Sequence, residues 1–142
     1  MVAESGCQDA GEGVLLMTKR QKAIEVTEAT KKKVLERQNY KSISGAALTT
    51  RSVNYHHVLP RSSSGVGYEW NIVAMTSEEH MMYHDHLSIV FNGRELFTWD
   101  EFDTLIKNHL KINYPNWSLK LCRYNKYFDT EEEYGVIHES IR

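Results

Sequence analysis

The chain has 142 residues, 41% of them hydrophobic and 25% charged, a composition typical of one globular domain with its own core. It contains no apolar run of the roughly 20 residues that a membrane-spanning helix requires, and its first residues lack the features of a secretory signal. Its two cysteines, Cys7 and Cys122, form neither a disulfide framework nor a C-x-x-C pair of zinc ligands. We therefore expect a cytoplasmic protein with no membrane partner.

The net charge is −2, but the charges are unevenly distributed along the chain. Between residues 17 and 64, ten basic residues (Lys19, Arg20, Lys22, Lys31, Lys32, Lys33, Arg37, Lys41, Arg51, Arg61) stand against three acidic ones (Glu25, Glu28, Glu36). A basic half of this kind can bind a phosphate backbone although the whole chain is slightly acidic. We therefore take DNA as the candidate partner, with Lys31, Lys32, Lys33 and Arg51 as candidate phosphate contacts. A solvated helix face explains the three lysines equally well.

The predicted elements begin after a short leader. Residues 1–16 show no hydrophobic periodicity, and we expect them to be disordered, so that residues 17–142 form a single domain. Residues 27–38 favour a helix with a thin apolar stripe. Residues 53–59 and 71–75 are predicted as two short strands, joined by a long loop that contains proline and the segment RSSSGVG.

Two capping boxes, TSEE at 76–79 and TWDE at 98–101, mark the starts of two further helices. In a capping box the first and fourth residues bind each other's otherwise unpaired backbone N–H groups. We expect these helices to cover residues 76–88 and 98–114, with a small hairpin around an Asn-Gly turn between them. The predicted fold class is therefore α+β. In the remaining segment, 117–128, basic residues alternate with aromatic ones, which favours packing with charges in solvent over a DNA contact.

Five of the seven histidines lie between residues 56 and 86. His56 and His57 are neighbours on a predicted strand, so their side chains point to opposite faces and do not readily serve one metal together. His80 and His84 are four residues apart on one face of a predicted helix, a spacing that lets two imidazoles share an ion. His56, His80 and His84 are thus candidate metal ligands, and we expect His86 at the surface on the other side of this helix.

The residues around these histidines suit phosphodiester hydrolysis. Imidazole titrates near neutral pH, so His57 is a candidate general base that takes a proton from water. Asn71 can orient His57 or its loop through amide hydrogen bonds. Arg61 follows the histidine strand closely and presents a planar set of donors to a phosphate.

The segment YHHVLPRSSSGVGYEWNIVAMTSEEHMMYH, residues 55–84, resembles the HNH endonuclease motif, in the cysteine-less form common in bacteriophage genes and homing endonucleases. The resemblance covers roughly residues 54–87. It implies a ββα-metal motif, here with flanking helices, and one divalent metal ion per site (Mg²⁺, Mn²⁺, Ni²⁺ or Zn²⁺). It also implies cleavage of DNA by a monomer or homodimer, in the host cytoplasm if the gene belongs to a phage.

By position, the resemblance makes His56 the first metal ligand, His57 the general base and Asn71 the orienting asparagine. His80 and His84 correspond to the histidines of the motif helix, at least one of which ligates the metal.

Many members of this family enclose the motif in a zinc ribbon of two C-x-x-C pairs. The corresponding positions here hold Lys41 and Ser44, then Thr76 and Glu79, so we expect no structural zinc. We expect the capping box at Thr76 and Glu79 to supply part of the missing stabilisation.

Two alternatives remain open. The first is a module that keeps the same scaffold to bind DNA or metal without cutting, and the second is a protein whose histidines hold a structural metal. A pure binding module has no use for a base beside the metal, so His57 and Asn71 favour the nuclease. Metal loss would unfold a protein of the second kind, whereas a catalytic site would lose activity with its fold largely kept.

Overall fold

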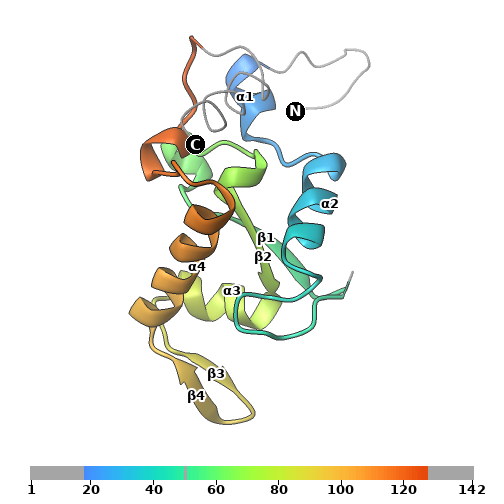
Figure 1. Cartoon of the computed structure of the whole chain (residues 1–142), viewed down its shortest axis with the longest axis vertical. Helices are drawn as coiled ribbons and strands as arrows, with labels where there is room; N and C mark the ends of the chain where they lie inside the picture. The colour runs from blue at the N-terminus through green and yellow to red at the C-terminus, as the bar shows by residue number, and fades with distance from the viewer. Residues whose placement is uncertain (1–17, 50, 128–142) are drawn as a thin grey trace, which may run out of the picture.

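A computed structural model describes residues 18–49 and 51–127, so the leader predicted for residues 1–16 lies outside the described residues. The fold mixes helices with two small antiparallel sheets, which agrees with the predicted α+β class (Figure 1). The elements are α1 (Lys19–Ile24), α2 (Glu28–Arg37), β1 (Val53–His57), β2 (Ile72–Thr76), α3 (Ser77–His84), β3 (Ile89–Phe91), β4 (Arg94–Phe97) and α4 (Trp99–Asn113), with short 3-10 turns at Arg61–Ser63, Glu69–Asn71 and Leu119–Cys122. None of the described helices has the length and apolarity needed to cross a membrane.

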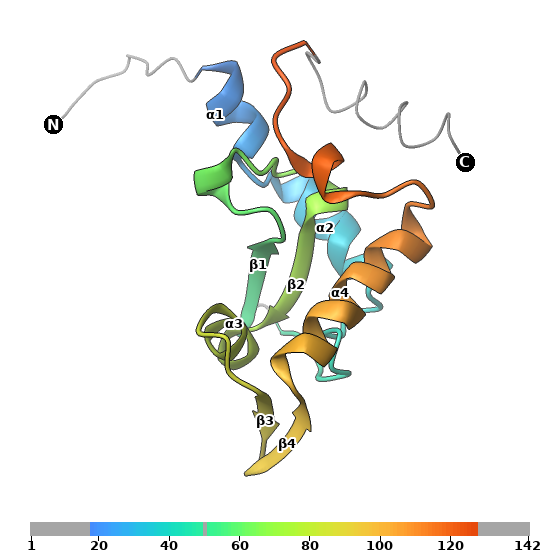
Figure 2. The same cartoon turned by 90° about the vertical axis from the view of Figure 1, so that its left-hand side faces the viewer.

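The centre of the molecule is the antiparallel pair of β1 and β2, in a register that places His56 opposite Val73. Side chains alternate across a strand, and β2 is buried on both faces. Val73 and Met75 join the main core with α4, whereas Ile72 and Ala74 join a smaller core beneath α2. This two-sided packing explains why β2 is apolar from Ile72 to Met75. Beside it, β1 lies with α1 above it and α3 below it (Figure 2).

The C-terminal end of α2 covers the edge of β2 that faces away from β1. The Gln38 side chain donates to the Ala74 carbonyl and accepts from the Ala74 N–H, both at 2.9 Å. Arg37 donates from Nη2 to the Ile72 carbonyl at 2.7 Å. Side chains thus replace a third strand, and these backbone groups do not remain unpaired.

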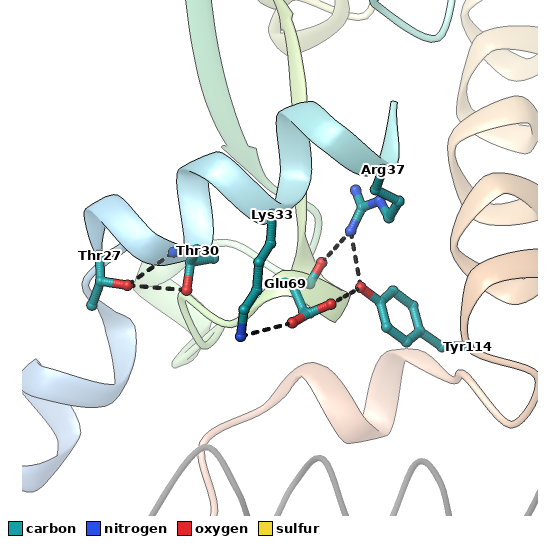
Figure 3. A network of polar contacts seen from close by, with 6 residues as sticks. All are labelled: Thr27, Thr30, Lys33, Arg37, Glu69 and Tyr114. Carbon is teal, nitrogen blue, oxygen red and sulfur yellow. Dashed lines mark hydrogen bonds and ion pairs between the residues drawn. The ribbon is translucent and has the colours of Figure 1, made fainter. Parts of the chain in front are cut away.

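A polar network joins α2 to α4 (Figure 3). Arg37 Nη1 donates to the Glu69 carbonyl at 2.6 Å and to the Tyr114 hydroxyl at 3.2 Å. That hydroxyl donates to Glu69 Oε1 at 2.5 Å, and Lys33 pairs with Glu69 Oε2 at 3.5 Å. Arg37 Nε also donates to His109 Nε2 at 2.9 Å, so this histidine is neutral and satisfied at the edge of the core.

The start of α3 and α4 and the end of α3 are set by local hydrogen bonds and backbone conformation. The predicted capping boxes are present, at Thr76 with Glu79 and at Thr98 with Glu101. The helix predicted over 76–88 ends earlier, at His84, because His86 adopts a left-handed conformation with φ 58°. The backbone then closes a Schellman motif, a reversal that the sequence pattern did not reveal.

The C-terminal described segment closes the main core. The Trp117 indole donates to the Trp70 carbonyl at 2.6 Å, and Cys122 is fully buried. The Val66 N–H donates to the Cys122 carbonyl at 2.8 Å, which ties this segment to the loop between β1 and β2. The packing interpretation of segment 117–128 is thus confirmed for Trp117, while residue 128 lies beyond the described part.

The Glu79 carboxylate accepts several hydrogen bonds at the start of α3. Besides closing the capping box at 2.9 Å, Oε1 accepts from the Ser42 hydroxyl at 2.5 Å. Oε2 accepts from the Ser44 hydroxyl, and the Glu79 side chain is buried. One carboxylate therefore links the loop after α2 to the start of α3, which extends the role expected of the capping box.

Replacing Glu79 with alanine should lower the free energy of unfolding by about 2–4 kcal/mol, because two serine hydroxyls and a backbone N–H lose their acceptor. Urea denaturation measures the effect. Glu78 lies beside it in the same helical turn and is exposed, so Glu78→Ala is the matched control and should cost less than about 1 kcal/mol. Equal losses in the two variants would refute a special role for Glu79.

Candidate functional site

Four of the five clustered histidines meet at one cleft of about 850 Å³ beside β1. Its walls come from the segment between α1 and α2, from α2, β1, the loop after β1 and α3. They include Glu25, Lys31, Asn54, Tyr55, His56, His57, Arg61, Ser62, His80 and His84. The β1–β2 pair places His56 and His57 in this cleft, and α3 brings in the other two histidines. His86 lies elsewhere and stacks on the Trp99 ring at 4.3 Å, in agreement with its predicted surface position.

His56 and His80 lie side by side in this cleft. Their ring centroids are 5.2 Å apart in an edge-to-face arrangement, and His56 also meets the Tyr83 ring edge-on at 5.1 Å. Burial, reinforced by His80, lowers the pKa of His56 to about 4. Burial likewise lowers the pKa of His80. Both imidazoles are therefore neutral at physiological pH and keep a lone pair that can bind a metal ion.

The third predicted metal ligand, His84, points differently. It lies one turn after His80 but is largely exposed, and its Nδ1 is 3.2 Å from the Asp85 carboxylate. As a result, no three histidine, cysteine or acidic side chains within residues 18–49 and 51–127 are grouped closely enough to hold an ion. The structure thus brings two of the three predicted ligands together, and leaves the third on the same cleft without packing to orient it.

Asn54 is a contact of the site that the sequence reasoning missed. Its side-chain amide lies 2.9 Å from His80 Nδ1 and 3.3 Å from the Ser77 hydroxyl. The amide nitrogen of Asn54 donates to Nδ1, so in the neutral ring Nε2 of His80 carries the proton. A turn of the Asn54 amide, so that its oxygen accepts from Nδ1–H, would free the Nε2 lone pair for an ion, and either contact restricts rotation of the ring.

His57 has a defined tautomer. Its Nε2 lies 2.9 Å from the carbonyl oxygen of Ile24, the last residue of α1. A carbonyl oxygen only accepts, so Nε2 carries the proton and Nδ1 holds the lone pair. Burial lowers the pKa of His57 and outweighs the opposing effect of the Ile24 hydrogen bond, so the ring stays neutral. The sequence contains no signal for this contact, because it joins residues 33 positions apart.

Asn71 orients the loop and not the His57 ring. This fully buried side chain accepts from the Leu59 N–H at 2.7 Å and donates to the carbonyls of Leu59 at 3.1 Å and Val66 at 2.7 Å. Both ends of the loop that carries Arg61 are therefore tied to one amide. Of the two functions that the sequence suggested for Asn71, the described hydrogen bonds support the second, and we treat it as a positioning residue.

The predicted phosphate contacts separate into two groups. Arg61 and Lys31 line the cleft. Arg61 pairs with Glu25 at 2.7 Å, and Lys31 pairs with Glu28 at 3.0 Å. Lys33 instead faces Glu69 on another side of α2, because residues two apart on a helix point in different directions. Lys32 and Arg51 are exposed but are not part of the cleft wall.

Comparisons of the chain with protein-family models, with curated proteins and with solved structures found no match. The interpretation of the cleft therefore depends on its own geometry and on the residues of the motif.

Replacing Asn71 with aspartate keeps the shape of the side chain but turns two donated hydrogen bonds into repulsion between a carboxylate and two carbonyl oxygens. We expect the free energy of unfolding to fall by about 2–4 kcal/mol, and amide exchange to accelerate around Leu59 and Val66. Asn108→Asp, at an exposed position of α4, is the control and should change stability by less than about 0.5 kcal/mol. Unchanged exchange in the loop of the Asn71 variant would contradict this role.

Proposed function

We propose that this chain is a metal-dependent endonuclease of the HNH type that hydrolyses phosphodiester bonds of DNA, with β1, β2 and α3 forming its ββα-metal motif. The observation that carries the proposal is the arrangement in one cleft of two adjacent neutral imidazoles, His56 and His80, with a third, His57, whose Nε2 is held by a backbone carbonyl. Histidines with a purely structural function would not require two rings that can bind an ion, His56 and His80, beside a third, His57, with a fixed tautomer.

The donor set fits a divalent cation. His56 makes no hydrogen bond to any described side chain or backbone group through its ring, so its nitrogens remain available within the cleft. His56 and His80 would hold the ion together with His84, which lines the same cleft and would have to turn away from Asp85 to do so. A bound divalent ion would stabilise the charge that develops on the phosphate and on the leaving oxygen.

His57 would act as the general base. With Nε2 committed to the Ile24 carbonyl, Nδ1 is the nitrogen that can take a proton from the attacking water. The same hydrogen bond stabilises the imidazolium formed, because the protonated ring still donates through Nε2. Neutrality before the reaction follows from the lowered pKa of His57, so the base is ready at neutral pH.

Arg61 and Lys31 would bind the substrate. Both line the cleft from sides next to the histidines, and both are paired with exposed or half-exposed glutamates. Ion pairs of this exposure contribute little to stability, so the phosphates of DNA can replace the carboxylates as partners. Arg61 suits this role best, since its guanidinium can bind two phosphate oxygens at once.

One observation favours a second candidate, a module that binds DNA or metal without cutting. The exposed fraction of His57 is 8%, and a base this buried meets water less readily than an exposed one. The two candidates differ in a single measurable property, which is strand cleavage.

Supercoiled plasmid incubated with the purified protein and Mg²⁺, Mn²⁺, Ni²⁺ or Zn²⁺ should be nicked or linearised, and EDTA should prevent this. His57→Ala should lower the cleavage rate by about 10²- to 10⁴-fold, because proton transfer to a positioned base contributes that much. Metal affinity, measured by calorimetry, should remain.

His86→Ala is the control, because this ring lies outside the cleft, and its cleavage rate should match that of the wild type. Equal cleavage by wild type and the His57 variant would refute the assignment of the base. Binding of metal and DNA by the wild type with no cleavage under any of the four ions would favour the second candidate.

A further inference from the structure

We propose that a second cavity, between α1 and the loop after β1, binds a backbone phosphate of the same nucleic-acid strand beside the one in the histidine cleft. The cavity has a volume of about 470 Å³ and is lined by Arg20, Gln21, Ile24, Glu25, Arg61 and Ser62. This inference rests on the proposed function for the identity of its ligand, and it assigns to α1 a role in substrate binding that the motif does not cover.

The two cavities adjoin. Glu25, Arg61 and Ser62 belong to the walls of both, so the space beside α1 lies next to the histidine cleft, with Arg61 at their common wall. A nucleic acid offers a regular row of phosphates along its strand. A strand held at His56 and His80 can therefore extend along this path, with Arg61 between two successive binding positions.

Arg20 supplies the positive charge at the far end of this path. It is exposed on α1, and its Nε donates to the Ser64 hydroxyl at 3.0 Å. This bond uses one of the five N–H donors of the guanidinium and attaches the side chain to the loop. The four donors of the terminal amino groups suit a phosphate, which the guanidinium can bind through two oxygens.

Glu25 stands between the two cavities. Its carboxylate pairs with Arg61 at 2.7 Å, and both side chains are about half exposed, at 49% and 55%. A phosphate on this path needs the position next to Arg61 that the carboxylate occupies. Glu25 therefore keeps Arg61 extended toward the path while it weakens the binding of any anion there. The negative charge of Glu25 should therefore lower the affinity for DNA.

The C-terminal end of α1 also contacts a residue of the histidine cleft, because the Ile24 carbonyl accepts the hydrogen bond from His57. DNA bound along α1 would thus contact the element that orients the proposed base. The side chain of Arg20 lies outside the histidine cleft, so its substitution tests the path without altering the proposed catalytic residues.

The test is binding of a fluorescently labelled duplex dodecamer, measured by anisotropy in EDTA over a series of salt concentrations. Arg20→Ala should weaken binding by about 3- to 10-fold at low salt, and the slope of log affinity against log salt should fall by about one, because one phosphate contact is lost. Glu25→Gln should strengthen binding by about 2- to 5-fold, as expected when a half-exposed ion pair is removed.

Two matched variants separate phosphate binding from structural effects. Ser64→Ala removes the partner of Arg20 but keeps the charge, and its salt slope should equal that of the wild type. Arg94→Ala removes an exposed arginine from β4, at the opposite end of the molecule from α1, and should change neither affinity nor slope (Figure 1). Thermal unfolding of each variant shows whether its fold is intact.

The possible outcomes are distinct because the assay needs no catalysis. A wild type that binds the dodecamer with the same affinity and slope as Arg20→Ala overturns the proposed path and leaves the nuclease proposal standing. An equal loss in the Ser64 or Arg94 variant overturns it as well, since the effect is then not specific to the Arg20 charge. A wild type that binds no DNA overturns both proposals.

Discussion

The buried amide of Asn71 is the constraint on which the site depends. Its three hydrogen bonds join the two ends of the loop between β1 and β2 in a part of the core that water does not reach. This loop contains Gly67, whose N–H donates to the Ala23 carbonyl at 2.7 Å. Gly67 also lets α1 approach the loop closely, because a Cβ at this position would lie 2.2 Å from the Glu25 carbonyl oxygen. This docking brings the Ile24 carbonyl to His57. The buried Asn71 amide therefore orients the His57 ring indirectly, through the Gly67–Ala23 and Ile24–His57 hydrogen bonds.

In the cleft, the neutral histidines and the positively charged side chains are different residues with different surroundings. Burial lowers the pKa of His56, His57 and His80, so these imidazoles enter the cleft uncharged and with lone pairs available for a metal ion or a proton. The positive charge that would attract DNA in the proposed function comes instead from Arg61 and Lys31 at the cleft wall, where both side chains pair with glutamates. A cleft of charged histidines would repel the cation that the proposed reaction needs.

Features of the fold that depend on neighbouring residues were predictable from the sequence. The capping boxes, the hairpin and the helical spacing of His80 and His84 each depend on residues within four positions of one another. Contacts between distant segments were not predictable, because they have no periodic signature. Helix α1 was missed for its shortness, and with it the Ile24 carbonyl. The edge contacts between Gln38 and β2 also emerge only in three dimensions. The orientation of His84 is a local matter, because its ring faces the adjacent Asp85, but helical spacing alone does not reveal it. The prediction that Asn71 fixes His57 or its loop identified the residue, and only the structure could choose between the two.

In the proposed site, His56, His80 and His84 bind one ion while His57 stays outside the coordination shell with Nε2 protonated. Long-range proton–nitrogen NMR of the histidine rings, recorded with and without one equivalent of Zn²⁺, tests it most directly. The nitrogen shifts of the three ligand rings should change on addition of Zn²⁺, while His57 should show a protonated Nε2 and an unprotonated Nδ1 in both spectra. A His57 ring that coordinates zinc, or His56 and His80 rings that do not respond to it, would rule out this division of roles.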